Sequence, residues 1–343
     1  MNQPIEDMLR QAGVDAVIHE ITPSSAGGNN RIYRVETSAG VFSAKQYFRH
    51  ESDPRDRLSS EYAFLQYAGK VAPGFVPRVY ARNHEAGLAL YEYINGEHFV
   101  VGRVAWNHVE QAAAFFKALN GPIMRESPRN LPLASEACFS IVEHLALVAG
   151  RIDRLREAIS TSDDEHQDAI RFLEELQHFW IMLVRRVSAE SEQAGWLDKP
   201  LDAEQCCVSP SDFGFHNALL QPDGHIEFID FEYSGIDDPA KMAGDFFAQL
   251  AVPVPDEFFE EFVQQCMQVF PDPQNLVWRA RLLRPVYQVK WCCIAMNVFL
   301  SIHMARRKFA NAHLDETVLK QAQLNKAKLI LKTLQQKTTN DIH

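Results

Sequence analysis

Three polar residues in the second half of the chain have the types and spacing expected of a phosphoryl-transfer site. Asp212 is followed five residues later by Asn217, and Asp230 lies farther along. Carboxylate and amide oxygens are ligands that Mg²⁺ accepts, with water and phosphate completing its shell. A carboxylate just ahead of such a metal can orient an acceptor hydroxyl and take its proton. We therefore interpret Asp212 as a catalytic base and Asn217 and Asp230 as metal ligands.

A predicted β-hairpin explains how these residues come together. Two short strands, 218–221 and 225–230, flank the sequence Pro222-Asp223-Gly224, which is typical of a hairpin turn. Asn217 enters the first strand and Asp230 leaves the second, so both should lie at the open end of the hairpin. The alternative, that the three polar residues are ordinary turn and loop residues, is common for any one of them and rare for all three together.

A second group of residues, near the N-terminus, completes the expected site. Strands at 32–37 and 41–48 form a predicted hairpin, and a helix is predicted at 58–68. Lys45 lies in the second strand and Glu61 on the helix. In kinases, a strand lysine contacts the α- and β-phosphates and a helix glutamate holds it, in this order along the chain. A solvated lysine and a surface glutamate are the alternative.

A glycine-containing loop precedes the first of these strands. Its residues Gly27, Gly28 and Asn29 would cover the phosphates with backbone N–H groups. Two glycines are a weak signal alone. No Gly-Lys-Ser/Thr sequence follows them, so this is not a Walker A loop.

We expect an α+β protein with two lobes. Residues 1–94 are rich in strand patterns, whereas residues 95–343 are mainly helical apart from the hairpin. In the helical part, apolar residues recur at spacings of three and four, as at Ile141, Leu145 and Val148. This order differs from the regular strand–helix alternation of a Rossmann-type sheet.

The composition is that of a globular enzyme. The chain has 343 residues, of which 46% are hydrophobic and 23% charged, and its net charge is −11. That charge argues against nucleic acid or an anionic membrane as a partner. The N-terminal segment lacks the apolar core of a signal peptide, and no apolar run reaches the roughly 18 residues of a membrane span. The six cysteines show no CxxC spacing, so we expect reduced, buried thiols in a cytoplasmic protein.

Two stretches resemble a known family. Residues 209–217 have the sequence Ser-Pro-Ser-Asp-Phe-Gly-Phe-His-Asn, and residues 228–233 have the sequence Phe-Ile-Asp-Phe-Glu-Tyr. Asp237-Asp238-Pro239 follows them. The chain resembles the aminoglycoside phosphotransferase and choline-kinase-like family over about residues 20–300. That resemblance implies a bilobal protein-kinase-like fold, with a small β-rich N-lobe and a larger, mainly helical C-lobe. It also implies transfer of a phosphate from ATP, with Mg²⁺, to a small-molecule hydroxyl.

The resemblance also assigns roles to individual residues. The family's catalytic aspartate corresponds to Asp212, and its metal ligands correspond to Asn217 and Asp230. Its strand lysine and helix glutamate correspond to Lys45 and Glu61.

The same resemblance places the linker between the lobes around Tyr93, where the backbone would bind adenine. One position departs from the family, because Pro210 replaces the histidine usually found two residues before the catalytic aspartate. His216 could brace the loop instead, but we interpret it as a simple packed or exposed histidine. We interpret Asp238 as a residue that ties down the turn after the metal strand, and Asp245 as a helix cap.

The sequence says little about the acceptor. Aminoglycosides are cations, and the net charge of −11 fits them loosely. A predicted helix at 279–296 carries basic residues that would suit an anionic or sugar-phosphate acceptor, although a solvated helix face is the more common explanation. Core packing is the more common explanation for its aromatic residues. These residues are Arg279, Arg281, Arg284 and Lys290, with Tyr287 and Trp291. We expect a hydroxylated metabolite, such as a sugar, an amino alcohol or an aminoglycoside-like compound, and a monomer or homodimer.

Two other functions are open. A pseudokinase that binds nucleotide or acts as a scaffold would fit the loss of the loop histidine, but not the presence of the base, both metal ligands and Lys45. A protein kinase is disfavoured, because no activation segment ending in Ala-Pro-Glu follows Asp230.

Overall fold

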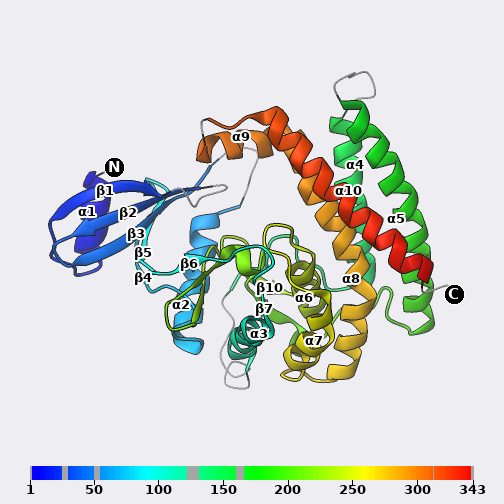
Figure 1. The fold of residues 1–343 in the computed structure, drawn as a ribbon. Helices are drawn as coiled ribbons and strands as arrows, with labels where there is room; N and C mark the ends of the chain where they lie inside the picture. Colours follow the sequence, from blue (N-terminus) through cyan, green and yellow to red (C-terminus); the bar gives the residue numbers. More distant parts are fainter. Residues whose placement is uncertain are drawn as a thin grey trace.

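The computed structural model describes residues 2–24, 30–49, 55–121, 131–159, 166–311 and 313–340. Residues 338–340 are described by their backbone only. A β-rich N-terminal part lies beside a larger, mainly helical part (Figure 1). This arrangement confirms the predicted α+β class with a sheet region followed by a helical region.

The N-terminal part is a five-stranded antiparallel sheet with helices α1 (Asn2–Gln11) and α2 (Arg57–Val71). The strands lie in the order β1 (Ile18–Ser24), β2 (Arg31–Thr37), β3 (Gly40–Gln46), β5 (Leu88–Glu92) and β4 (Val79–Asn83). Successive side chains of a strand point to opposite faces. Accordingly, Leu88 and Leu90 of β5 pack in the core that includes α1, whereas Ala89 and Tyr91 pack in the core that includes α2. The alternation explains why the sheet holds a helix against each face.

The C-terminal part is built from helices packed around α8 (Pro273–Met296). This helix contacts α4 (Ile141–Ala158), α6 (Pro239–Ala248) and α10 (Glu316–Asn340). The predicted apolar stripe on α4 is confirmed, because Ile141, Val148 and Ile152 are fully buried. The other helices of this part are α3 (Trp106–Asn120), α5 (Gln167–Gln193), α7 (Phe259–Met267) and α9 (Ser301–Ala310). Single 3₁₀ turns lie at Ala203–Gln205, Phe215–Asn217, Asp256–Phe258 and Asn297–Phe299.

Short strands interrupt the helical part. The predicted hairpin is present as β8 (Ala218–Leu220) and β9 (Ile226–Phe228), joined at its edge by β6 (Glu97–His98). A second pair is formed by β7 (Cys207–Ser209) and β10 (Gly235–Asp237). Both β8 and β9 are shorter than predicted. Ahead of β4, which begins at Val79, Phe75 packs its ring against Phe115 and its carbonyl accepts a hydrogen bond from the backbone N–H of Phe228.

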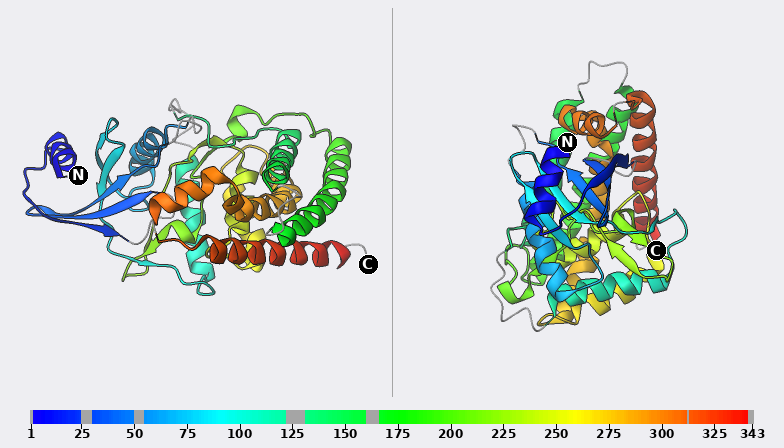
Figure 2. Two further views of the ribbon diagram at one scale, coloured as in Figure 1. Left: turned by 90° about the horizontal axis from the view of Figure 1, so that it is seen from above. Right: turned by 90° about the vertical axis from the view of Figure 1, so that its left-hand side faces the viewer.

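Helix α9 returns from the helical part to the sheet (Figures 1 and 2). Near its end, the Phe309 carbonyl accepts a hydrogen bond of 3.1 Å from Arg31 Nε, and the Phe309 ring packs on Phe48. Helix α9 is therefore a second connection between the two parts, in addition to the chain that follows β5.

The six cysteines are buried, which confirms the predicted burial of their thiols. Within the described ranges, no helix is long and apolar enough to cross a membrane.

Candidate active site

The hairpin β8–β9 places Asn217 and Asp230 on neighbouring chain segments. Ala218 pairs with Phe228, and the Asn217 carbonyl accepts a hydrogen bond of 2.9 Å from the backbone N–H of Ile229. Below the hairpin, the rings of Phe213, Phe215, Phe228 and Phe246 pack against one another. The aromatic packing holds the loop and the hairpin as one unit.

Asp212 lies at the centre of a small hydrogen-bonded group. The side-chain Nδ2 of Asn217 donates to the Asp212 carbonyl oxygen at 3.0 Å, and His216 Nε2 lies 3.2 Å from Asp212 Oδ1. Burial raises the pKa of Asp212, but the His216 ring and the Asn217 amide outweigh that effect, and the pKa lies below its ordinary value. Asp212 is therefore held as a carboxylate, the form that can accept a proton.

His216 corrects one interpretation from the sequence. It is neither a simple packed nor an exposed histidine, because it is partly buried and contacts Asp212. Gly214 makes this contact possible, since a Cβ at that position would lie 2.8 Å from His216 Nδ1. His216 thus braces the loop that carries Asp212.

Lys45 and Glu61 meet as predicted. Lys45 Nζ donates to Glu61 Oε2 at 2.6 Å and also forms an ion pair with Asp230. Glu61 is anchored further by the Tyr47 hydroxyl at 2.6 Å and by the backbone N–H of Phe231 at 3.1 Å. Burial lowers the pKa of Lys45, but the surrounding carboxylates outweigh it and raise that pKa well above its usual value. The lysine is therefore a fixed positive charge, not a surface residue.

A buried ion pair beside Lys45 was missed by sequence reasoning. Arg57 NH1 lies 2.6 Å from Glu232 Oε1, and Asn30 Nδ2 donates to Glu232 Oε2 at 2.6 Å. Glu232 belongs to the motif after Asp230, but Arg57 carries no local signal, because its partner lies 175 residues away along the chain. The pair anchors the segment after Asp230 to the start of α2.

The surroundings of Asp230 raise the pKa of its carboxyl. Burial and the carboxylates of Glu232 and Glu61 raise the pKa of Asp230 to about 7, although Lys45 lowers it. A divalent cation would relieve this repulsion. Asp230 Oδ2 receives no hydrogen bond from the described residues, and the Asn217 amide nitrogen is used by Asp212. The oxygens left on Asn217 and Asp230 fit the hard ligands that Mg²⁺ takes.

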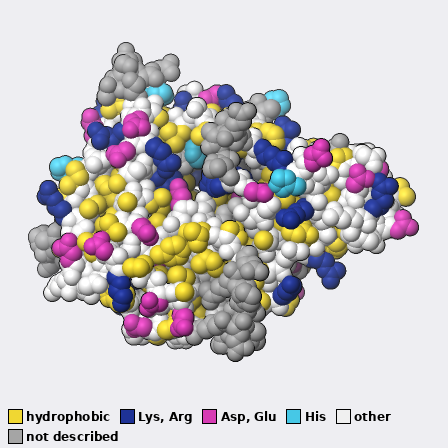
Figure 3. All heavy atoms as spheres, turned by 180° about the vertical axis from the view of Figure 1, so that it is seen from behind, with side chains coloured by type: hydrophobic (Ala, Val, Ile, Leu, Met, Phe, Trp, Pro, Cys, Tyr) yellow, Lys and Arg dark blue, Asp and Glu magenta, His cyan; other side chains and the backbone are white. Residues whose placement is uncertain are grey.

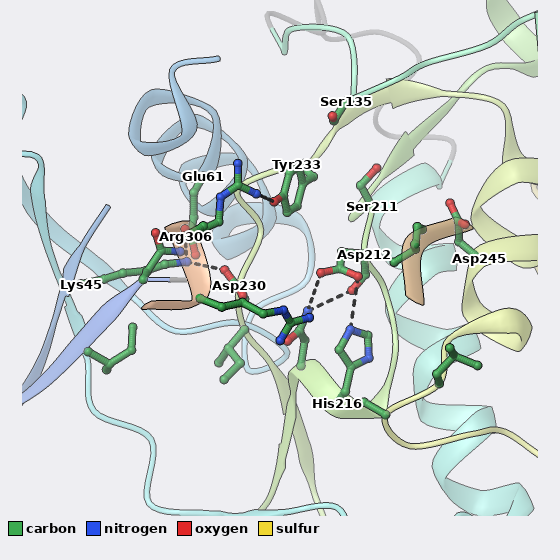
Figure 4. Close-up of a pocket in the computed structure, with 18 of the residues that line it drawn as sticks. Lys45, Glu61, Ser135, Ser211, Asp212, His216, Asp230, Tyr233, Asp245 and Arg306 are labelled. Atoms are coloured by element: carbon green, nitrogen blue, oxygen red, sulfur yellow. Dashed lines mark hydrogen bonds and ion pairs between the residues drawn. The ribbon is translucent and has the colours of Figure 1, made fainter. Parts of the chain in front are cut away.

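These residues line one cleft of about 670 Å³ between the sheet and the helices. Figure 4 shows Lys45, Glu61 and Asp230 on one side of it, and Asp212, His216 and Asp245 on the other. Tyr93, at the end of β5, also lines the cleft. Gly27, Gly28 and Asn29 lie outside the described residues. No group of three His, Cys, Asp or Glu side chains placed to hold a metal occurs among the residues that the structure describes.

Backbone conformation sets the cleft apart from the rest of the chain. Five non-glycine residues in the described part have a positive φ: Glu136, Ser211, Asp212, Asp230 and Asp272. All but Asp272 line the cleft. Such conformations cost free energy for residues other than glycine and tend to occur where function requires a set geometry.

The basic residues of α8 are paired with carboxylates. Asp238 caps α6, because its carboxylate accepts a hydrogen bond from the backbone N–H of Ala240. Arg279 is buried and donates from Nε to the same carboxylate at 2.6 Å, so Asp238 also ties α8 to α6. Asp245 is not a helix cap, since its carboxylate lies within α6 and binds Lys290 Nζ at 2.8 Å and Trp291 Nε1 at 2.8 Å. Arg281 and Arg284 pair with Glu260 and Asp256. Tyr287 is buried in the core, as expected.

Comparison with known proteins gives a consistent result. The sequence model of a phosphotransferase enzyme family matches residues 20–266. No curated protein sequence matches the chain.

Solved structures resemble this one along nearly its whole length. An ethanolamine kinase from Plasmodium vivax is 12% identical, with 92% of this chain and 83% of that chain covered and a TM-score of 0.57. A choline kinase from Cryptosporidium parvum is 13% identical, with coverages of 94% and 91% and a TM-score of 0.59. A spectinomycin phosphotransferase solved with ADP and spectinomycin is 12% identical, with coverages of 96% and 98% and a TM-score of 0.57. At these identities the likeness establishes the fold.

Proposed function

The chain belongs to the phosphotransferase enzyme family, and we propose that it is an ATP-dependent kinase that phosphorylates a hydroxyl of a small molecule. One observation carries the proposal most strongly. Lys45 of the sheet forms an ion pair with Asp230 of the hairpin, in the cleft that Asp212 also lines. The phosphate-binding lysine, the metal ligands and the base are then within one space.

In this proposal the nucleotide lies between an N-lobe of residues 1–94 and a C-lobe of residues 95–343. Lys45, held by Glu61, would contact the α- and β-phosphates, and the backbone around Tyr93 would bind the adenine. The loop that contains Gly27, Gly28 and Asn29 would cover the phosphates. The similar fold of the spectinomycin phosphotransferase, which was solved with ADP, supports this use of the cleft.

Asn217 and Asp230 would hold Mg²⁺, whose charge offsets the negative charge of the phosphates when it is bound. Asp212 would accept the proton of the acceptor hydroxyl. The hydroxyl oxygen then bonds to the γ-phosphorus, and the bond from that phosphorus to the ADP oxygen breaks with its electron pair leaving on ADP. His216 and Asn217 keep the Asp212 carboxylate ionised and in place for this step.

Nucleotide binding is the direct test. We expect ATP with Mg²⁺ to raise the melting temperature of the wild-type protein at millimolar nucleotide, because a ligand that binds only the folded state stabilises it. Asp230→Ala should lose the part of the shift that depends on Mg²⁺. Asp223→Ala, in the exposed turn of the same hairpin, is the matched control and should keep it.

The outcome also separates the proposal from the pseudokinase alternative. A wild-type protein that shows no shift with ATP and Mg²⁺ would contradict the kinase and favour a scaffold. Nucleotide binding with no ADP released over a broad panel of alcohols would favour a nucleotide-binding pseudokinase.

A further inference from the structure

Basic residues gather on the helical side of the cleft, which faces the sheet that carries Lys45. Arg151 and Arg154 come from α4, Arg307 from α9 and Lys326 from α10, and all four line the cleft. We call these four residues the basic cluster. Figure 3 shows lysine and arginine side chains around a hollow between the two parts of the molecule.

The charges of the basic cluster are poorly matched. Glu136 is its only ion-pair partner among the described residues, and it contacts Arg151 closely and Arg154 at 4.0 Å. Arg307 is partly buried, and its side chain has no hydrogen bond or ion pair to any described residue. The buried Nε of Arg151 also lacks a hydrogen-bond partner in the described part. A partly buried arginine is normally paired, so this arrangement suits an anionic ligand.

The surroundings of His303 support a positive local field. His303 lines the same cleft, and its pKa is lowered to about 4 by burial and by the charges of Arg306, Arg151, Arg55 and Arg154. Burial and Arg306 likewise lower the pKa of Arg307. Although the whole chain carries a charge of −11, this end of its cleft is positive.

A series of contacts links the basic cluster to the proposed base. His216, beside Asp212, packs edge-on against the Trp291 ring with centroids 6.4 Å apart. Trp291 Nε1 donates to Asp245, which also binds Lys290. Burial raises the pKa of the Glu136 carboxyl, whereas Arg151 and then Lys290 lower it. Lys290 therefore lies close to Glu136. The basic cluster therefore adjoins the Asp212 side of the cleft.

We infer that the acceptor is an alcohol that also carries a phosphate group, and that this phosphate binds between Arg151, Arg154, Arg307 and Lys326. Guanidinium groups match phosphate oxygens in pairs of parallel hydrogen bonds. Several cations at one site suit a doubly charged phosphate better than a single carboxylate. The inference rests on the proposed kinase function, and it excludes choline-like and aminoglycoside-like cations as the main acceptors.

Calorimetric titration with inorganic phosphate would test the site, in the presence of Mg²⁺ and a saturating non-hydrolysable ATP analogue. The analogue occupies the nucleotide phosphates' own site, so that only a second site is measured. We expect wild-type protein to bind phosphate. The variant Arg154→Ala/Arg307→Ala should bind it about tenfold more weakly or worse, because hydrogen bonds to charged groups are lost. Arg185→Ala, an exposed arginine on α5, should change nothing.

A panel of alcohols with a phosphate ester, the same alcohols without it, and amino alcohols would complete the test. Phosphate-bearing alcohols should be the best acceptors, and the double variant should raise their KM while Arg307→Lys keeps part of the affinity. Preferred turnover of amino alcohols or neutral alcohols would overturn the inference while leaving the kinase intact. The inference would also be overturned if the double variant lost affinity for the nucleotide but kept its affinity for phosphate. If wild-type protein bound no nucleotide at all, the proposed function itself would fail.

Discussion

The two ends of the cleft carry opposite surpluses of charge. At the sheet end, three carboxylates, those of Glu61, Asp230 and Glu232, surround Lys45 and Arg57. At the other end, the four residues of the basic cluster face Glu136 alone among the described residues. The first end suits a cation and the second an anion. The net charge of a chain therefore does not predict the charge of its site, since a cleft concentrates the field of its own lining.

The largest expected effect concerns Asp212, which lies between the two ends. Asp212→Asn should lower the rate of ADP formation by about 10²- to 10⁴-fold, because an amide cannot accept the hydroxyl proton. Binding of ATP with Mg²⁺ should be nearly unchanged, as measured by the nucleotide-dependent melting shift. Asp223→Asn serves as the control. Near-full activity of Asp212→Asn would show that Asp212 is not the base.

Stability should distinguish the two ends directly. Glu61→Ala removes a buried partner of Lys45 and should lower the free energy of unfolding by about 3–5 kcal/mol. Arg154→Ala should change it by less than about 0.5 kcal/mol or raise it slightly, since it removes repulsion from a half-exposed arginine. Calorimetric melting without ligand gives both values.

Two results would refine that contrast. Glu61→Gln keeps an acceptor for Lys45 and Tyr47 and should cost less than Glu61→Ala. Equal losses for Glu61→Ala and Arg154→Ala would mean that the basic cluster is as well matched as the Lys45 group, which would contradict the comparison.

A smaller effect is expected at His216. His216→Ala should lower kcat roughly tenfold, and it should move the acidic limb of the pH–rate profile to higher pH. The reason is that His216 lowers the pKa of Asp212, whose carboxylate is active above its pKa and lost as the pH falls through it. The profile of kcat against pH checks this. A lower rate with an unmoved acidic limb would mean that His216 only supports the loop.

The smallest effect concerns Glu227, a buried residue of β9. Burial and the nearby Glu92 raise the pKa of Glu227 to about 7. The folded protein therefore binds a proton that the unfolded chain releases, and this contribution to stability is lost as the pH rises through 7. Glu227→Gln should be more stable than wild type at pH 8 by on the order of 1 kcal/mol, and equal to it at pH 5. Melting curves at the two pH values measure the difference, and an equal gain at both would rule out titration of Glu227 as its cause.

Much of the fold could be predicted because it follows from local patterns. Alternating apolar residues indicate the strands, and the spacing of three and four indicates helices such as α4. The hairpin was predictable from its turn, and with it the closeness of Asn217 to the segment that carries Asp230. The contact between Lys45 and Glu61 followed from the order of strand and helix. The catalytic and ligand roles of these residues stay predictions.

Other contacts were decided by tertiary structure. Arg57 meets Glu232 only because the start of α2 packs on the segment after the hairpin. His216 meets Asp212 in a folded loop where a Cβ at position 214 would clash with the His216 ring. The sequence drew attention to the basic residues of α8, which turned out to be matched by carboxylates. The poorly matched ones come from α4 and, much later in the chain, from the consecutive helices α9 and α10. A pattern along the chain records which face of a helix is buried, whereas the partner that a charge meets across a cleft depends on how distant helices pack.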